Sequence, residues 1–159
     1  PLIVMTPKGH LRSKESVSSL DDLATGAFQR IIPDATVDPA KARKVILCSG
    51  KVYWDLANAR AARKVTDVAI VRLEQLYPLS KRVLDAALAP YRAGTPVTWV
   101  QEDPWNMGAW YFLAARLPEL LGGRHPLTCV ARDESASPAT GSEKSHGLEQ
   151  ADILDKALA

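Results

Sequence analysis

The sequence contains too little of several features to fit some classes of protein. Only two of its 159 residues are cysteine, which argues against a disulfide framework or a cysteine metal site. The longest apolar runs, such as Val68–Val71 and Phe112–Ala115, are far too short to cross a bilayer. No basic start leads into an apolar core, as in a secretory signal. The chain begins at Pro1 without a methionine, and we expect it to be part of a longer protein.

A strong excess of one charge is also missing. The formal net charge is +2, which is too mild to indicate a nucleic-acid partner. Residues 1–66 hold 11 basic and 6 acidic side chains, whereas residues 67–159 hold 9 and 12. This asymmetry suits a surface that meets another domain or an anion, but a solvated surface is the preferred explanation. We therefore expect neither nucleic acid nor a membrane as a partner.

The two cysteines, Cys48 and Cys129, each lie inside an apolar run. Cysteines in such runs usually act as small buried hydrophobic side chains, so we expect reduced thiols rather than a disulfide or a metal site. Reduced thiols indicate a reducing compartment, and the bacterial cytoplasm and the mitochondrial matrix both fit.

A regular alternation of strand and helix patterns predicts the fold class. Four short apolar runs, rich in β-branched residues, begin about 23 to 30 residues apart, which is the length of a βαβ unit. Their near-continuous apolar character is typical of parallel strands covered on both faces. We predict a three-layer α/β/α sandwich with a mainly parallel sheet. The expected strands are Val45–Cys48, Val68–Leu73, Val97–Val100 and Leu127–Val130.

Each expected strand is followed by apolar residues at helical spacing. We expect Ser80 to cap the second helix, one continuous third helix between Ala109 and Leu120, and a last helix after Ser142. The expected helices cover residues 52–63, 81–91, 109–120 and 143–157.

The segment before the first of these strands has a different pattern. We predict two parts, an N-terminal arm, helix and linker over residues 1–43 and the α/β domain over residues 44–159. Within the first part, Leu2–Met5 resembles a short strand. Ser19 and Asp22 form a capping box that opens a helix, and this helix must end before Pro33. Residues 34–41 are expected to be a linker.

Ligands of open parallel sheets gather at the carboxyl ends of the strands, where Lys51 and Glu102 are expected. The run Ser49–Lys51 is not a phosphate-binding loop, because Val52 stands where a magnesium-binding hydroxyl is needed. It remains either a weaker anion site or a tight turn. Asp103 follows Glu102 directly, so the two carboxylates point to opposite faces and do not form an acid–base pair.

No complete active site emerges from the remaining polar residues. The histidines, at positions 10, 125 and 146, have no partner at metal-ligand spacing, and no serine or cysteine lies on a nucleophile elbow. We therefore predict no catalytic residue, cofactor ligand or metal ligand in this chain.

The densest aromatic patch follows the third expected strand. It contains Trp105, Asn106, Trp110 and Tyr111. Aromatic residues with glycine and asparagine in such a loop are typical either of a packed core corner or of a protein interface, and we keep both interpretations. The small, polar stretch Ser135–Ser142 predicts a surface loop that fits against a partner domain.

Five motifs together resemble the C-terminal part of the 2-oxoglutarate dehydrogenase E1 component. They occur in the order of that family and span nearly the whole chain. The motifs are Pro1–Lys8 with Leu11 and Arg12, Cys48–Tyr53, Asp67–Pro78, Gln101–Trp110 and Ser135–Gly141. The same domain of another thiamine-diphosphate enzyme, such as pyruvate dehydrogenase E1 or transketolase, is the neighbouring alternative, and the Gln101–Trp110 motif argues against it.

The resemblance implies a large homodimeric enzyme that uses thiamine diphosphate and Mg²⁺. It decarboxylates 2-oxoglutarate and passes the succinyl group to the lipoyl arm of its partner, the E2 dihydrolipoyl succinyltransferase, in the tricarboxylic acid cycle. The cofactor and the catalytic histidines of the family lie in earlier domains. The resemblance thus implies a non-catalytic, transketolase-like C-terminal domain that supports dimerisation and the neighbouring catalytic domain, and an isolated chain without activity.

Some family members carry a nucleotide or acetyl-CoA effector site at the edge of this domain. The resemblance places such a site at Gln75 and Arg82, with Lys81 near the position of a second arginine. Lys51 adds a further cation for phosphate. Val83 stands where the family has its second arginine. AMP or acetyl-CoA binding at these four residues is therefore an alternative role for the chain, that of a regulatory domain.

Overall fold

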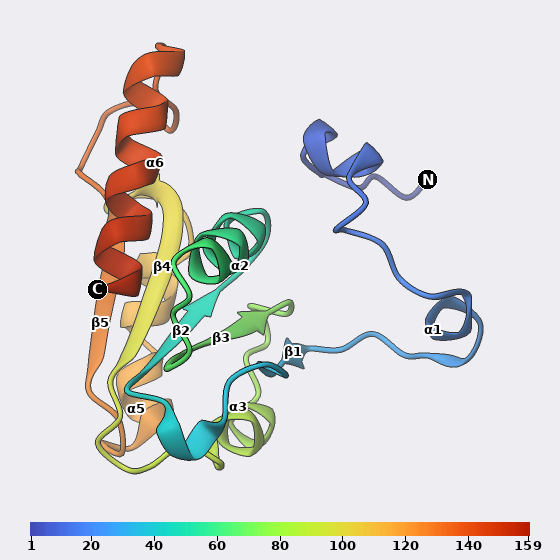
Figure 1. The fold of residues 1–159 in the computed structure, drawn as a ribbon, viewed down its shortest axis with the longest axis vertical. Helices are drawn as coiled ribbons and strands as arrows, with labels where there is room; N and C mark the ends of the chain where they lie inside the picture. Colours follow the sequence, from blue (N-terminus) through green and yellow to red (C-terminus); the bar gives the residue numbers. More distant parts are fainter.

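The computed structural model describes residues 1–159, and its centre is one five-stranded sheet (Figure 1). The strand order is β1-β3-β2-β4-β5. All neighbouring strands are parallel except β1, which runs antiparallel to β3. The mainly parallel sheet is thus confirmed. The strands are β1 (Ile31–Ile32), β2 (Lys44–Cys48), β3 (Val68–Leu73), β4 (Val97–Pro104) and β5 (Leu127–Arg132).

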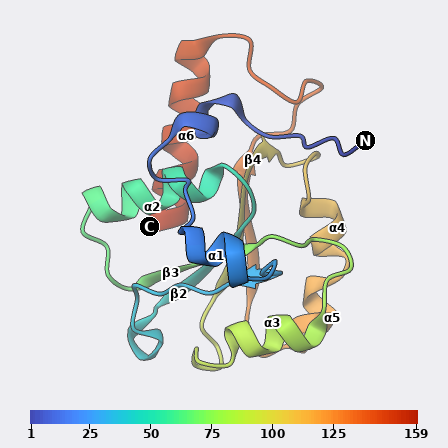
Figure 2. The same ribbon diagram turned by 90° about the vertical axis from the view of Figure 1, so that its right-hand side faces the viewer.

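Helices cover both faces of this sheet, which confirms the α/β/α sandwich (Figures 1 and 2). On one face lie α2 (Val52–Ala62) and α6 (Glu143–Leu158). On the other lie α3 (Lys81–Leu88), α4 (Trp110–Ala114) and α5 (Leu117–Leu121). Alternating side chains of β2 fill the two cores, because Val45 and Leu47 join one cluster and Ile46 and Cys48 the other.

The expected single helix over residues 109–120 is wrong, because the structure has two short helices there. Arg116 breaks the run with φ −120° and ψ −40°, and α5 begins at the next residue. Pro118 lies in the first turn of α5, where its missing N–H costs no helical hydrogen bond. In a continuous helix the same proline would remove one bond from the interior, so the chain begins a new helix instead.

Other element boundaries shift by a few residues. β4 continues past Val100 to Pro104, with an irregular register against β5 between these two residues. Ser80 is the residue before α3, as expected, but its side chain makes no capping hydrogen bond. Ser142 does cap α6, because its hydroxyl accepts a hydrogen bond from the Ser145 amide.

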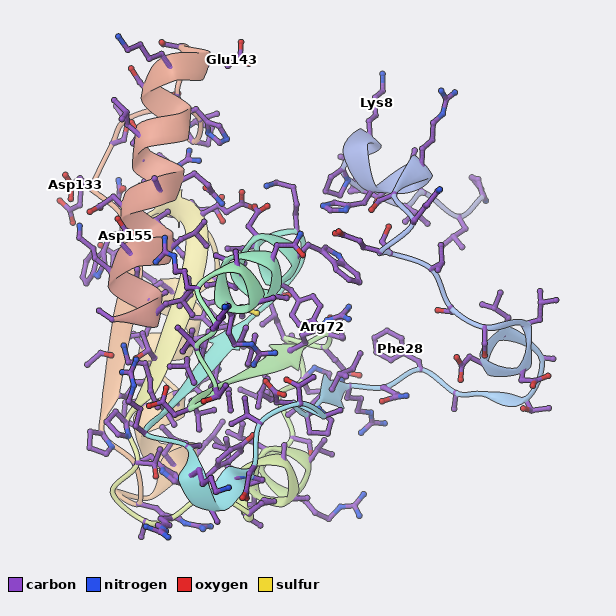
Figure 3. All side chains as sticks on the ribbon, viewed as in Figure 1. Lys8, Phe28, Arg72, Asp133, Glu143 and Asp155 are labelled. Atoms are coloured by element: carbon purple, nitrogen blue, oxygen red, sulfur yellow. The ribbon has the colours of Figure 1, made fainter.

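The N-terminal arm loops out from the sandwich and contacts it again at α2, where the Asn58 side chain donates to Glu15 at 3.1 Å (Figure 1). Leu2–Met5 forms no strand, because no neighbouring strand pairs with it. A 3₁₀ turn, η1 (Lys8–Arg12), is followed by α1 (Leu20–Thr25), whose predicted capping box of Ser19 and Asp22 is present. α1 ends before Gly26. Figure 3 shows Phe28 apart from the side chains of the sandwich, and 71% of its surface is exposed.

Residues 31–42 connect the arm to the sheet and contribute to its core. β1 pairs with β3, and a 3₁₀ turn, η2 (Pro39–Lys41), precedes β2. Ile31, Val37 and Ala42 belong to the cluster on the α3 face. The expected linker therefore carries core side chains. The division into residues 1–43 and 44–159 stays a prediction.

Candidate functional site at the carboxyl ends of the strands

The strand order reverses between β2 and β4, and this is where open sheets of this kind bind ligands. From β2 the chain first adds β3 on one side and then β4 on the other. Lys51 follows β2, and Glu102 lies near the carboxyl end of β4. The two residues therefore stand at the crevice where a ligand would be expected.

This crevice is bridged by an ion-pair network of the chain's own side chains. The Lys51 ammonium lies 2.6 Å from a Glu102 carboxylate oxygen and 2.9 Å from one of Asp55. The Gln150 amide donates to the same Asp55 carboxylate at 3.0 Å. Burial lowers the pKa of Lys51, but the hydrogen bonds to Glu102 and Asp55 outweigh burial and hold that pKa above its usual value. The network joins β4, α2 and α6 and leaves Lys51 neutralised.

The neighbouring thiol has no nucleophilic character. Cys48 ends β2 and is fully buried, and burial raises the pKa of its thiol to about 12. Cys129 on β5 is half-buried, and burial raises the pKa of its thiol to about 12 as well. Both cysteines are free, as expected, and both are protonated at neutral pH, whereas a nucleophile needs the thiolate.

The four residues of the predicted effector site lie on different parts of the fold. Lys51 opens α2, whereas Lys81 and Arg82 open α3 on the opposite face of the sheet. Lys81 pairs with Asp85 at 2.8 Å, and Arg82 is exposed. Gln75 donates to the Pro78 carbonyl at 2.9 Å. Lys81, Arg82 and Gln75 follow β3 closely, but none of their hydrogen bonds or ion pairs links them to Lys51.

Gln101 organises the loop between β4 and α4, a role that the sequence did not reveal. Its side-chain oxygen accepts from the Trp99 indole at 2.9 Å and from the Trp110 amide at 3.1 Å. Its side-chain nitrogen donates to the Met107 and Pro104 carbonyls at 2.8 and 3.0 Å. Only 4% of Gln101 is exposed, so these bonds satisfy a buried amide completely.

The aromatic patch divides into a buried and an exposed part, and its role as an interface stays a prediction. Trp110 is 9% exposed and belongs to the core. Trp105 and Tyr111 are 39% and 52% exposed, and their rings meet edge to face at 5.3 Å. The Asn106 amide exchanges two hydrogen bonds with the Ser135 backbone, so this corner is tied to the loop after β5. Trp105 and Tyr111 are thus exposed side chains on a loop whose backbone is fixed by the Asn106–Ser135 hydrogen bonds.

An apolar groove lies beside this patch. A cavity of about 300 Å³ is lined by Leu76, Tyr77, Gly108, Ala109 and Phe112, and one of about 210 Å³ continues from Tyr77 and Phe112 towards α5. Tyr77 is 77% exposed and meets the Phe112 ring at 6.1 Å. With Trp105 and Tyr111, this groove gives the carboxyl end of the sheet an exposed aromatic surface.

A buried ion pair fixes the segment between β1 and β2 against α2 and β3. The Asp34 carboxylate accepts from the Arg60 guanidinium and from the Ile70 amide on β3. Burial alone would raise the pKa of Asp34, but the bonds from Ile70, Arg60 and Thr36 hold it below its ordinary value. Arg60 was not identified from the sequence, although its spacing of four and eight residues from Leu56 and Val52 is a signal that could have placed it on the buried face of α2.

A family model described as "2-oxoglutarate dehydrogenase C-terminal" matches residues 17–158. The chain belongs to this family. Over 160 residues it is 43% identical to a "2-oxoglutarate dehydrogenase E1 component" of Cupriavidus necator, covering 100% of this chain and 17% of that protein. It is 40% identical to a protein of the same name from Azotobacter vinelandii, covering 99% and 17%. It is 42% identical to a "Multifunctional 2-oxoglutarate metabolism enzyme" of Mycolicibacterium vanbaalenii, covering 99% and 13%.

This 2-oxoglutarate dehydrogenase C-terminal chain spans only about a sixth of the length of the curated relatives it matches. Among solved structures it is similar to a chain described as "Split gene transketolase, inactive beta4 tetramer", with a TM-score of 0.49 and 19% identity. That likeness covers 75% of this chain and 40% of the other. No helix is both long and apolar enough to span a membrane.

The residues of this family member do not fit thiamine diphosphate with Mg²⁺. No three histidine, cysteine or acidic side chains gather where they could hold a metal ion. The crevice at the β2–β4 switch is bridged by Lys51, which pairs with both Glu102 and Asp55, so no uncompensated positive charge remains there for a diphosphate.

Proposed function

We propose that residues 1–159 form the non-catalytic C-terminal domain of a 2-oxoglutarate dehydrogenase E1 component. Its role is to support the catalytic domain and the dimer of an enzyme that decarboxylates 2-oxoglutarate. The observation that carries this proposal is the Lys51–Glu102 pair, because it bridges the position where a sheet of this topology binds a ligand. Membership of the family supports this assignment. The chain covers only 17% of a curated E1 relative, so the catalytic domains would lie in the part of E1 outside residues 1–159.

Exposed apolar surface supports the contact role. Large exposed patches on soluble proteins usually mark interaction sites. The Trp105–Tyr111 pair and the groove around Tyr77 and Phe112 lie together at the carboxyl end of the sheet. The arm adds a second apolar surface with nine exposed side chains: Leu2, Ile3, Val4, Met5, Leu11, Val17, Leu20, Leu23 and Phe28. We assign both surfaces to contacts with the rest of the E1 chain and with the second E1 subunit.

The complete enzyme needs further components under this proposal. Thiamine diphosphate and Mg²⁺ bind in the other domains of E1, and the E2 succinyltransferase receives the succinyl group. The two protonated, free thiols suit the bacterial cytoplasm or the mitochondrial matrix as the compartment.

The contact role is tested in the full-length E1 protein. We expect the double variant Trp105→Asp, Tyr111→Asp to weaken the dimer and to lower activity in parallel, since a carboxylate cannot replace an aromatic ring in a desolvated contact. Sedimentation at several protein concentrations measures the dimer. Leu148→Asp is the matched control, because Leu148 is 67% exposed on α6, outside the proposed surface. A double variant that matches Leu148→Asp in both measurements would refute the assignment.

The regulatory alternative stays a prediction. Arg82 and Gln75 follow β3, where the family resemblance implies an AMP or acetyl-CoA site, and Arg82 is exposed. Lys51 and Lys81 are each held by carboxylates of the chain itself, which weakens the support from these two residues. Calorimetric titration with AMP and acetyl-CoA, repeated on Arg82→Ala, separates this alternative from a purely architectural domain.

A further inference from the structure

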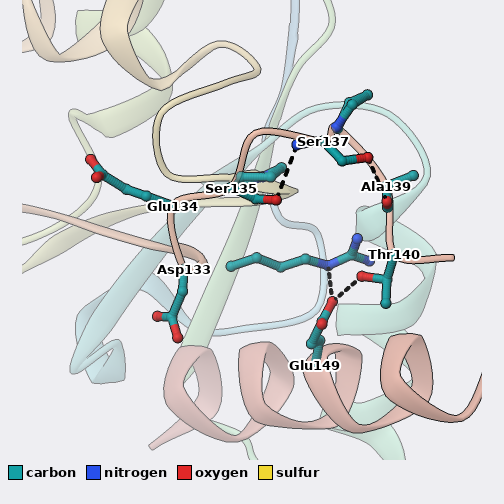
Figure 4. Close-up of a pocket in the computed structure, with 10 residues that line it drawn as sticks. Asp133, Glu134, Ser135, Ser137, Ala139, Thr140 and Glu149 are labelled. Atoms are coloured by element: carbon teal, nitrogen blue, oxygen red, sulfur yellow. Dashed lines mark hydrogen bonds and ion pairs between the residues drawn. The ribbon is translucent and has the colours of Figure 1, made fainter. Parts of the chain in front are cut away.

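A polar cavity of about 320 Å³ lies at the carboxyl end of β5 and has no part in the proposed function (Figure 4). Its walls are Pro104 at the end of β4, Arg132 at the end of β5, the loop 133–140, and Glu149 on α6. We call it the loop cavity. The loop that shapes it is held in place from outside, because Asn106 binds the Ser135 backbone through two hydrogen bonds.

The loop cavity contains a buried guanidinium with unused hydrogen-bond donors. The Arg132 side chain is only 9% exposed. Its Nη2 lies 2.8 Å from the His146 Nδ1 atom, and its Nε lies 3.3 Å from a Glu149 oxygen without meeting hydrogen-bond geometry. Nη1 makes no hydrogen bond within the chain and, unlike Nε, it is not a fully buried atom. The guanidinium therefore has one buried donor without a hydrogen bond, Nε, and one accessible donor, Nη1, that is free to bind a ligand in the cavity.

The charges around Arg132 determine which partner fits. Three carboxylates line the loop cavity, those of Asp133, Glu134 and Glu149. Figure 4 shows the Asp133 and Glu134 carboxylates turned away from Ser137 and Thr140, whereas Glu149 points to Thr140 and accepts a hydrogen bond from its hydroxyl. One cation beside several acidic groups favours a singly charged anion over a phosphate dianion, because each added negative charge is repelled.

We propose that the loop cavity binds a small organic acid through a single carboxylate. That carboxylate pairs end-on with Nη1 and Nη2 of Arg132, the geometry in which arginine binds carboxylates with two parallel hydrogen bonds. The volume lies at the lower end of the range for ligand sites, which suits an acid of a few carbon atoms. This site is independent of the contact role proposed above.

The probe is sodium propionate, titrated into the 159-residue chain at constant ionic strength. The ¹⁵N–¹H resonance of the Arg132 Nε group reports binding. We expect a saturable shift in the wild type and weakening of about tenfold or more in Arg132→Gln, because the charge-assisted pair is lost. We expect Glu149→Gln to bind propionate about three- to tenfold more tightly, since it removes a competing carboxylate.

Arg116→Gln is the matched control, since this exposed arginine lies outside the loop cavity and its loss leaves the affinity unchanged. Inorganic phosphate is the competing anion and binds more weakly than propionate. The proposal is overturned by the absence of a saturable shift, by equal affinity in Arg132→Gln, or by equal affinity for phosphate. If circular dichroism shows that Arg132→Gln does not fold, the Glu149→Gln variant provides the test. An unchanged affinity of Glu149→Gln for propionate overturns the proposal.

Discussion

The Lys51 ammonium and the Glu102 carboxylate lie 2.6 Å apart across the position where the strand order of the sheet reverses. In a ligand-binding sheet of this topology, the same position is an open crevice. Here the ion pair ties the first turn of α2 to β4, and Asp55 and Gln150 extend it to α6. In this chain, the position is occupied by an ion-pair network that stabilises the fold.

Lys51→Met should destabilise the isolated chain. The change leaves Glu102 and Asp55 as two partly buried carboxylates without their cation, which we expect to cost about 1 to 2 kcal/mol in the free energy of unfolding. The folded pKa of Lys51 is raised, so its contribution is present at neutral pH and is lost only as the pH rises above about 10. Urea unfolding at pH 7 measures the loss.

The matched control for this change is Lys81→Met. Lys81 also pairs with an aspartate one helical turn away, but both side chains are more than half exposed, so we expect less than about 0.5 kcal/mol. The double variant Lys51→Met, Glu102→Gln should recover part of the loss. Equal effects for Lys51→Met and Lys81→Met would mean that the Lys51 network contributes nothing beyond a surface pair.

Gln101→Leu should disrupt the loop between β4 and α4. Leucine has nearly the same volume, but it leaves the Trp99 indole, the Trp110 amide and the Met107 carbonyl without their buried partner. We expect a loss of about 3 kcal/mol in the free energy of unfolding. Gln75→Leu, where a single bond to Pro78 lies in an exposed turn, should cost less than about 1 kcal/mol. Similar losses in both variants would contradict the organising role of Gln101.

Gly108→Ala tests how closely the same loop is packed. The residue has φ +66°, and an added Cβ would lie 2.7 Å from the Asp103 Oδ2 atom and 2.9 Å from its Cβ. Gly94 also has a positive φ, of +86°, but open space for a Cβ. We expect Gly94→Ala to cost about 1 kcal/mol and Gly108→Ala about 2 kcal/mol or more in thermal unfolding. An equal cost would show that Asp103 simply moves aside.

Asp34 should make the chain sensitive to acid. Its folded pKa lies below the ordinary value, so its stabilisation is present above the unfolded pKa of about 3.9 and is lost as the pH falls through the folded one. Asp34→Asn leaves Arg60 buried without a carboxylate and should cost about 3 kcal/mol at pH 6. Urea unfolding from pH 6 to pH 3 should show this difference shrinking below about pH 4.

The exposed Asp38 provides the comparison for that experiment. Asp38→Asn removes a carboxylate that is about half exposed in a surface pair with Lys41, so the stability should change little at any pH. A constant difference between the wild type and Asp34→Asn over the whole range would instead indicate that burial, not ionisation, explains the effect.

Local sequence patterns were sufficient to predict four of the five strands and most helices. The β-branched runs of β2 and β3 are buried on both faces, so their composition alone marks them as central parallel strands. The two-residue strand β1 has no such signal, because it exists through its pairing with β3. The break between α4 and α5 was signalled by Pro118, but the apolar spacing on both sides of it favoured one helix.

The side-chain networks could not be predicted in the same way. Gln101 belongs to a residue type that is mostly exposed, and its burial depends on carbonyls of a loop whose path only the folded structure defines. The sequence placed Lys51 and Glu102 at strand ends, but their pairing depends on the strand order, which local patterns do not encode.

The most direct test of the non-catalytic role is calorimetric titration of the isolated chain with thiamine diphosphate in the presence of Mg²⁺. With the β2–β4 crevice bridged by Lys51 and Glu102 and no metal-ligand cluster in the chain, we predict no measurable heat of binding. Saturable binding that Lys51→Met abolishes would contradict the account, because it would place a cofactor site in the crevice that we consider closed.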